Sequence, residues 1–384
     1  MLYTDVRERF LEAFAKAGFR RSPALSLVQP SIKTSFLFSV GFVDVLDAIA
    51  GKDAHMDGAA TVQRCFRHFD VDRVSDETHL SFFEMAGALR CSEWHIEDLI
   101  APLVRYLLQD CHVPRTRLHV TYFGGGNVAG DLLPPDSQAR DGYLKAGIAA
   151  DNIWTGDGST NIWFEGANSG TERSGICGPH SEMFFDLAPD SKAKMDTNPL
   201  KQPSRFIEVS NIVTITHRTR PGSDNGLEPL PRPLIELALG MERLEMVVTD
   251  VKTVHETPKL RYISDALLSA CAPDARGESF DRTLRIAVDH MRAVVHLIAD
   301  GGRPGAKGQG NVVRRVIKNL LRAADVLKLD LGALFPKMVQ IVIDVDHAIN
   351  PNLAQNMTVT VDVFDKEARR ILRRKSRLLP RRED

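Results

Sequence analysis

Hydrophobic positions near the start of the chain repeat with the period of a helix, and further on they alternate as in a strand. Residues 5–17 carry apolar side chains at helical spacing up to Gly18, which predicts an amphipathic helix: Val6, Phe10, Leu11 and Phe14. Residues 118–123 (LHVTYF) alternate and are β-branched, and glycines at 124–126 break them, so we predict a strand. Residues 206–216 (FIEVSNIVTIT) predict a second strand.

Helical periodicity dominates the later part of the chain. Residues 234–248 predict a helix with one apolar face: Leu237, Met241, Leu244 and Val248. Two more helices are predicted at 283–298 and 311–327, joined by the glycine-rich and basic loop DGGRPGAKGQG.

Three stretches follow neither period clearly. Residues 35–48 are apolar with aromatics and fit a strand, a helix, or one after the other. Residues 155–180 are rich in Gly, Ser, Thr and Asn and predict a long loop, which in a compact domain is usually functional or disordered. Residues 221–233 predict a turn-rich connector.

Strands thus dominate the first part of the chain and helices the last. This order indicates the α+β class, with an α+β domain followed by a helical domain. We place the boundary near residue 250, giving domains 1–250 and 251–384.

Composition narrows the function classes. The 384 residues are 43% hydrophobic and carry a formal net charge of -1, so no global field favours nucleic acid or an acidic membrane. No run approaches the ~18 apolar residues of a membrane span, and the mixed-charge start MLYTDVRERFLEAF is unlike a secretory signal. The five cysteines form no CxxC pair, which favours reduced thiols. We therefore expect a cytoplasmic protein without a membrane partner.

Single motifs are weak. No Walker A or GxGxxG pattern occurs, so neither a P-loop nor a Rossmann cofactor site is supported. No HExxH or HxxxH pair occurs either, so we expect no bound zinc. His79, His180 and His290 are lone histidines of a kind that is more often structural. Residues 366–384 carry nine Lys or Arg against three acids. That run fits a solvated helix end with a frayed terminus or a nucleic-acid contact, and the lack of aromatic residues disfavours the contact.

The motifs say more as a series. In order, the chain reads VQRCFRHFD, THLSFFEM, GICGPHSEM, EVSNIV, LGMERL, DHMRAVVHLIADGGRP and GNVVRRVIKNLLRAA. In order and approximate separation this series resembles the alanyl-tRNA synthetases, with their H-x-x-F-F-E-M, G-P-C-G-P-C-S-E-I, E-I-W-N-L-V, D-T-G-M-G-L-E-R and D-H-x-R-A. The resemblance covers nearly the whole chain. It implies a class II aminoacyl-tRNA synthetase core, an antiparallel sheet flanked by helices that binds ATP and an amino acid.

For ATP, the resemblance assigns four residues. Arg67 matches the arginine that grips the α-phosphate and the substrate carboxylate, a role that suits the planar fork of Arg. Arg243 matches the class II arginine that holds the triphosphate against the adenine. Phe83 matches the aromatic stacked on adenine, although an isolated Phe is more often a core residue, and Glu84 matches an acid beside the ring. During adenylate formation negative charge develops on the phosphate oxygens, so fixed cations and Mg²⁺ supply most of the catalysis in such a ligase.

For the amino acid, the resemblance assigns Trp163 and Asn211, with Val213 beside them, to the pocket. Glu182 and Glu208 lie in matching motifs and are candidate metal or ribose contacts. We take Glu208 as an ATP contact and a candidate Mg²⁺ ligand.

Departures from the family bear on the substrate. The family's D-T-G-M is Glu236-Leu237-Ala238-Leu239 here. The Asp that holds the substrate ammonium becomes Glu236, and Ala238 adds a methyl group beside the substrate. Both changes should reshape the pocket, so alanine, glycine, serine or a non-protein amino acid remain open. In an alternative alignment Glu236 is an unrelated helix residue.

Other departures bear on the acceptor. The segment between Arg67 and Phe83 is shorter than the family's, and the family's P-S-N is Pro304-Gly305-Ala306, so the amide that reads the acceptor stem is lost. The sequence shows no counterpart of the editing and C-terminal domains. We expect a ligase that makes an aminoacyl-adenylate and transfers it to tRNA, or to a carrier protein or small-molecule acceptor. The alternatives are a non-catalytic synthetase paralogue with a binding or regulatory role and, less favoured, a free-standing editing hydrolase.

Overall fold

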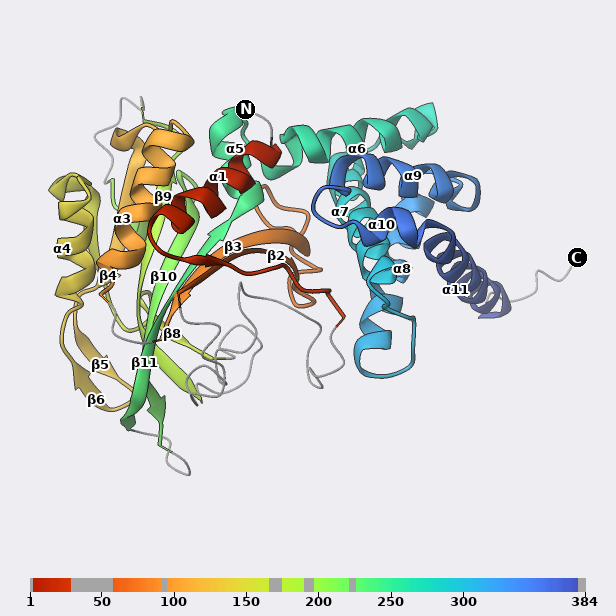
Figure 1. Cartoon of the computed structure of the whole chain (residues 1–384). Helices are drawn as coiled ribbons and strands as arrows, with labels where there is room; N and C mark the ends of the chain where they lie inside the picture. The colour runs from red at the N-terminus through yellow and green to blue at the C-terminus, as the bar shows by residue number, and fades with distance from the viewer. Residues whose placement is uncertain are drawn as a thin grey trace, which may run out of the picture. The chain divides into compact units, whose positions relative to one another are not determined.

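The computed structural model describes most of the chain (Figure 1). The described residues are 3–28, 58–91, 95–165, 175–189, 197–220 and 226–378, so the stretch 35–48 lies outside them. They fall into two compact units. The first comprises 3–24, 58–63 and the described parts of 84–252, and the second comprises 25–28, 64–83 and 253–378. The division into domains 1–250 and 251–384 stays a prediction.

A mixed, mainly antiparallel sheet organises the first unit. Its strand order, among the described residues, is β1-β2-β3-β11-β10-β9-β4-β7, and β8 pairs with β9. Its strands are β1 (Arg20–Arg21), β2 (Ala59–Phe66), β3 (Phe82–Arg90), β4 (Leu118–Phe123), β7 (Ile153–Gly156), β8 (Ile162–Phe164), β9 (Ile176–Asp186), β10 (Phe206–Thr219) and β11 (Leu227–Gly240). A separate hairpin joins β5 (Gly126–Val128) to β6 (Asp131–Leu133). The expected α+β class with an antiparallel sheet is confirmed.

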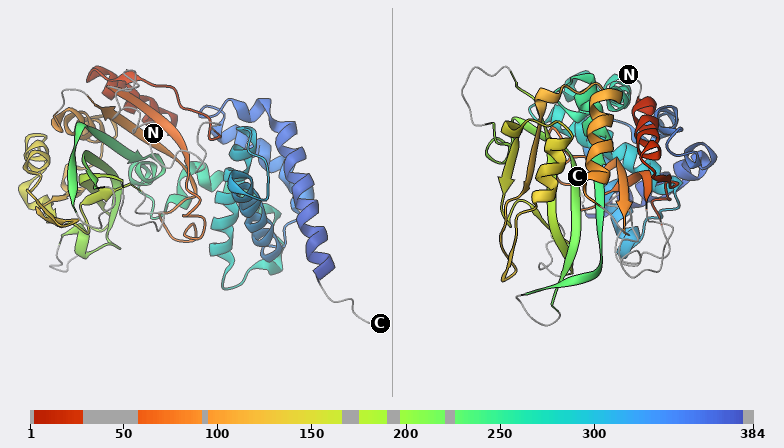
Figure 2. Two further views of the ribbon diagram at one scale, coloured as in Figure 1. Left: turned by 90° about the horizontal axis from the view of Figure 1, so that it is seen from below. Right: turned by 60° about the vertical axis from the view of Figure 1, so that its left-hand side comes forward.

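Helices cover one face of this sheet. They are α1 (Tyr3–Lys16), α3 (Glu97–Arg105), α4 (Ser137–Lys145) and α5 (Met241–Thr249). Figure 2 shows α3 and α4 side by side against the strands. The buried Tyr143 hydroxyl of α4 lies 3.0 Å from Ser181 Oγ on β9, so α4 packs on the face to which Ser181 points. The predicted helix at 5–17 is confirmed as α1, and Gly18 follows it with a φ of 87° that favours glycine.

The later part of the chain is helical, as predicted (Figure 1). Its helices are α6 (Pro258–Ala270), α7 (Phe280–Ala299), α8 (Gly308–Val326), α9 (Leu331–Asp346), α10 (Asn352–Gln355) and α11 (Met357–Leu378). Asp330 caps α9 by accepting hydrogen bonds from Gly332 N and Ala333 N. Phe335 of α9 stacks on Phe364 of α11 at 3.6 Å between ring centroids. The predicted helices at 283–298 and 311–327 are confirmed as α7 and α8.

The prediction of one helix over 234–248 is wrong in its first half. Residues up to Gly240 belong to β11, and α5 begins only at Met241. The side chains from Leu237 to Gly240 alternate between buried and half-buried, the period of a strand. Pairing of β11 with β3 on one side and β10 on the other overrides the helical spacing of the leucines. Glu236 is therefore a strand residue and not a helix residue, and its match to the family's Asp stays a prediction.

Two predicted irregular stretches also contain strands. Within 155–180, β8 pairs with the start of β9, so the stretch is not one long loop. Of the predicted connector 221–233, the part from Leu227 onward belongs to β11, although Pro229, Pro231 and Pro233 lack an amide hydrogen for pairing. In both stretches composition hid strands that long-range pairing stabilises.

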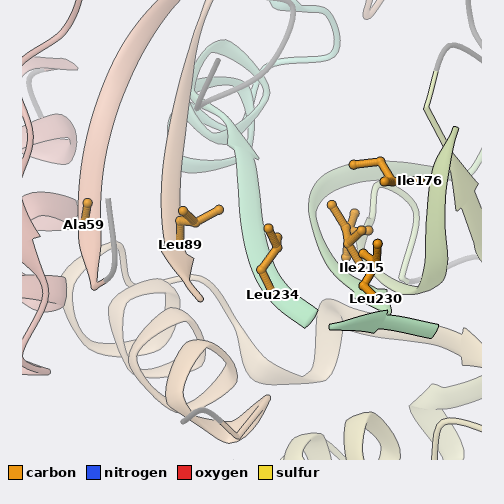
Figure 3. Close-up of a cluster of buried hydrophobic side chains, with 7 residues drawn as sticks. Ala59, Leu89, Ile176, Ile215, Leu230 and Leu234 are labelled. Atoms are coloured by element: carbon orange, nitrogen blue, oxygen red, sulfur yellow. The ribbon is translucent and has the colours of Figure 1, made fainter. Parts of the chain in front are cut away.

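A cluster of buried apolar side chains extends across several strands of the sheet (Figure 3). It consists of Ala59, Leu89, Ile176, Val213, Ile215, Leu230 and Leu234, contributed by β2, β3, β9, β10 and β11. Trp163 of β8 and Cys91 are partly buried against it. The cluster fixes these strands next to the polar residues described below.

Candidate active site

The sheet face opposite Ser181 is polar and half open. Along β9, His180, Glu182 and Phe184 are half-buried, whereas the alternating Ser181 and Met183 are fully buried. Successive side chains of a strand point to opposite faces, so His180 and Glu182 point away from the face that α4 covers. This second face is where most of the residues expected to bind the amino acid lie.

Two neighbouring rows of residues cross the strands on this face. In the first, the register pairs Gly87 with Ala238, Ala238 with Asn211, and Asn211 with Glu182. The absence of a side chain at Gly87 and the single methyl group of Ala238 leave this row shallow.

The second row pairs Leu89 with Glu236, Glu236 with Val213, and Val213 with His180. Directly opposite residues of an antiparallel pair share a face. The structure therefore brings Asn211, Val213, Glu236 and Ala238 together on one face, and their contact with an amino acid stays a prediction.

Trp163 lies beside the second row, opposite a residue two positions before His180 on β9. It pairs with Gly178 across β8 and β9, and its ring packs against the apolar cluster that contains Val213. Gly178 has a structural reason to be glycine, since a Cβ there would lie 1.8 Å from Thr214 O. Loss of that side chain permits the shift in register between β9 and β10 next to Val213.

An ion-paired triad borders the first row. Arg243, at the start of α5, donates from Nη1 to the Glu208 carbonyl oxygen at 2.9 Å and to Glu208 Oε2 at 3.2 Å. Asn211 donates from Nδ2 to Glu208 Oε1 at 3.0 Å. The Arg243 and Glu208 side chains are 25% and 32% exposed, so both remain accessible to a ligand.

The pKa values of Glu208 and Glu182, two of the carboxylates on this face, are shifted in opposite directions. Burial alone would raise the pKa of Glu208, but the Arg243 charge and the Asn211 hydrogen bond outweigh it and hold that pKa below its ordinary value. Burial raises the pKa of Glu182, and the negative charge of Glu208 adds to the shift, while the His180 contact at 3.1 Å opposes it. Glu208 is thus the residue kept ionised here.

Arg67 and Phe83 lie together in the second unit. The Arg67 guanidinium carbon is 5.0 Å from the centroid of the Phe83 ring, a cation–π distance, and both side chains are partly exposed. Phe82, the neighbour of Phe83, is fully buried. Phe83 is therefore not the core residue that an isolated phenylalanine suggests.

Glu84 is placed differently from an exposed ligand contact. It is fully buried, and its Oε1 accepts a hydrogen bond from Arg7 Nε of α1 at 3.2 Å. Its backbone amide donates to Glu242 Oε2 at 2.9 Å. The expected contact of Glu84 with adenine stays a prediction, and its visible role is to join β3 to α1 and α5.

Sequence reasoning overlooked Arg7 and Glu242, and it took His180 for a lone histidine of the structural kind. The spacing of His180 and Glu182, two residues apart in a strand, is the signal that would have placed both on one face. Arg7 lies 77 residues from Glu84, and no local pattern marks that pair.

Zinc and magnesium differ in the number of protein ligands that they need at this face. Among the described residues, no group of three or more His, Cys, Asp and Glu side chains is arranged to hold a metal. Mg²⁺ needs fewer protein ligands, because one or two carboxylates and the substrate phosphates suffice. Glu208, which is ionised and partly exposed, fits that requirement.

The fold and this face define an α+β protein with a half-open polar sheet surface. The family model for class II tRNA synthetases (A) matches residues 5–377. The chain belongs to this family, whose model covers both compact units.

Curated proteins that are similar to this chain are consistent with the match to the family model. The alanine–tRNA ligase of Rubrobacter xylanophilus is 31% identical over 333 residues, covering 84% of this chain and 36% of that protein. The alanine–tRNA ligase of Dehalococcoides mccartyi (strain ATCC BAA-2100) is 30% identical over 375 residues, covering 95% and 40%. The chloroplastic/mitochondrial enzyme of Sorghum bicolor is 29% identical, covering 96% and 37%. The chain thus spans about two fifths of the length of these relatives.

Among solved structures, the histidyl-tRNA synthetase of S. aureus aligns over 65% of this chain and 66% of that one, at 11% identity and a TM-score of 0.38. This TM-score is too low for the alignment to support an argument about the fold or the site.

Proposed function

We propose that this protein activates a small amino acid, alanine or a close analogue, as its adenylate at the expense of ATP. The observation that carries the proposal is the first row of the sheet face, where Ala238 and Asn211 adjoin the Arg243–Glu208 pair. Membership of the class II synthetase family supports ATP as the second substrate.

The proposed chemistry is an in-line displacement at phosphorus. A carboxylate oxygen of the amino acid forms a bond to the α-phosphorus of ATP, and the bond to the bridging oxygen of pyrophosphate breaks. No general base is needed, because the attacking carboxylate is already ionised at pH 7. Arg67 and Arg243 supply fixed positive charge for the phosphate oxygens, on which negative charge develops.

Mg²⁺ would accompany ATP, and Glu208 is the protein residue proposed to hold it. When bound, the ion neutralises phosphate charge. Arg243 and Asn211 keep the Glu208 carboxylate ionised and fixed in direction, as a metal ligand requires.

The acceptor of the activated amino acid is a separate proposal. A basic cavity of about 370 Å³ on α8 favours tRNA, with the lining residues Asp72, Asn311, Arg314, Arg315, Lys318, Asn319 and Arg322. Lys318 and Arg322 have no acidic partner among the described residues, so both are available to a phosphate. Against tRNA, Ala306 stands where the family has the asparagine that reads the acceptor stem. A carrier protein or small-molecule acceptor is therefore kept as the second candidate.

ATP–pyrophosphate exchange with a panel of small amino acids tests the activation. We expect exchange with at least one of alanine, glycine, serine and their close analogues. Failure with every member, in a folded sample, would contradict the proposal. Charging of total tRNA then separates a tRNA acceptor from the others.

Ala238 gives a prediction about substrate size. Changing Ala238→Gly is expected to shift kcat/KM in favour of alanine over glycine by about tenfold, because one methyl group in a pocket is worth about 1–3 kcal/mol. Exchange kinetics with both amino acids measure the ratio. Ala88→Gly is the matched control, since Ala88 pairs with Leu237 on the other face of the same strands. An unchanged ratio in Ala238→Gly would place the substrate elsewhere.

The alternative is a synthetase paralogue that binds without catalysis. Retention of Arg67, Phe83, Asn211 and Arg243 argues against it, because loss of chemistry leaves such charged and polar residues free to change. Calorimetry with ATP discriminates, since absence of binding at millimolar concentration would favour this alternative.

A cytoplasmic location is likewise proposed. None of the five cysteines, all of them in the described part of the chain, forms a disulfide, which suits a reducing compartment. No helix in the described part of the chain has the length and apolar character needed to cross a bilayer.

A further inference from the structure

Helix α7 contacts the segment that carries Arg67 and Phe83 through three buried polar side chains. Asp289, Arg292 and His296 are 1%, 1% and 0% exposed. Their spacing of three and four residues places them on one side of the helix. Each contacts Ser81 or Phe82, the two residues that precede Phe83.

Asp289 holds the backbone at the start of β3. Its Oδ1 accepts a hydrogen bond from Ser81 N at 2.8 Å and its Oδ2 accepts one from the Ser81 hydroxyl. Phe82 N lies 3.4 Å from the same Oδ1. Ser81 is fully buried, so water does not compete for these bonds.

Arg292 and His296 fix the next side chain. The His296 ring stacks on the Phe82 ring with centroids 4.2 Å apart, and the Arg292 guanidinium carbon lies 4.7 Å from the same centroid. These two contacts hold the Phe82 ring in place. Because successive side chains of a strand point to opposite faces, Phe83 points to the opposite face of β3.

The same turn determines where Arg67 sits. Arg67 N donates to Ser81 O at 2.8 Å. Ser81 thus bonds Asp289 through its amide and hydroxyl and bonds Arg67 through its carbonyl. A shift of Ser81 would move Arg67 and Phe83 together.

We propose that Asp289 is a positioning residue that aligns Arg67 and Phe83 for ATP through Ser81. This inference rests on the proposed function, because it takes ATP to be the ligand of these two residues. Asp289 itself does not touch the ligand. The role differs from a purely structural one in that its loss should weaken ATP binding in a folded protein.

The test uses the full chain with Asp289→Asn and, in case that variant fails to fold, Ser81→Ala. Calorimetric titration with ATP is expected to give a Kd about tenfold weaker in either variant. Exchange kcat/KM for ATP should fall by about a hundredfold, the loss that a displacement near 1 Å produces. Thermal melting and circular dichroism show whether each variant is folded.

His290→Gln is the matched control. His290 Nδ1 lies 2.9 Å from Asp289 Oδ2, so this variant disturbs the same carboxylate but leaves Ser81 bonded. We expect its Kd for ATP to stay within twofold of the wild type. A folded Asp289→Asn or Ser81→Ala protein with wild-type affinity for ATP would overturn the inference alone, whereas a wild type that binds no ATP would overturn it together with the proposed function.

Discussion

Replacing Arg67 by alanine is expected to lower kcat/KM for ATP–pyrophosphate exchange by about 10²–10³-fold. Loss of one preorganised group that stabilises developing charge costs about this much in other enzymes. The kcat/KM of Arg67→Lys should lie between those of the wild type and Arg67→Ala, because Lys keeps the positive charge but lacks the planar guanidinium. Exchange kinetics at saturating amino acid measure both variants.

Arg73→Ala is the control for this experiment. Arg73 lies in the same segment between β2 and β3, its side chain is 68% exposed, and its ion pair with Asp70 spans 4.0 Å. Such exposed pairs contribute little. We expect exchange within twofold of the wild type. If Arg67→Ala keeps more than a tenth of the wild-type rate, Arg67 does not hold the reacting phosphate.

Elements with a strong period were predictable from the sequence. The strand at 118–123 and the helices at 283–298 and 311–327 form where the local pattern of apolar residues predicts them. Propensity and period agree in these segments, so the local pattern is enough to predict the type of element.

The strand β11 could not be predicted in this way. Leu234, Leu237, Met241 and Leu244 repeat at helical spacing, yet the chain changes from strand to helix between Gly240 and Met241. Partners more than a hundred residues away on β3 decide the conformation of the first half. Such pairing carries no local signature.

Some features of the candidate site were likewise predictable from the sequence, and others were not. Motif resemblance located Asn211, Ala238, Glu208 and Arg243, and the register places these four next to one another or within hydrogen-bond reach. Resemblance gave no hint that Glu84 is buried beside Arg7. A motif names a residue, whereas its exposure depends on an element from elsewhere in the chain.

Residues that position others are the hardest to find from one sequence. Asp289 lies 208 residues from Ser81, and its carboxylate bonds to backbone, a hydroxyl and a histidine. A usable signal did exist, since a charged side of an otherwise buried helix must find partners. Asp289, Arg292 and His296 in DHMRAVVH form such a side, and the partners are those of the turn before β3.

The opposite end of this network is a buried carboxylate on α9. Asp346 is fully buried and accepts from Arg292 Nε at 2.7 Å, with Lys259 Nζ at 3.0 Å and His296 Nε2 at 2.9 Å. Burial alone would raise the pKa of Asp346, but the charges of Arg292 and Lys259 hold it well below the ordinary value. The carboxylate therefore stays ionised and balances two buried cations.

Changing Asp346→Asn is expected to lower the free energy of unfolding by about 3–5 kcal/mol, because it removes the charge of a buried carboxylate that both Arg292 and Lys259 contact. Urea unfolding followed by circular dichroism measures the change. A depressed folded-state pKa stabilises the protein above the unfolded value of about 3.9 and less as pH falls below it, so the wild-type advantage should shrink below about pH 4. Asp344→Asn, exposed two residues earlier on α9, should change stability by less than about 0.5 kcal/mol. A loss near that of the control would mean that the cations find other partners.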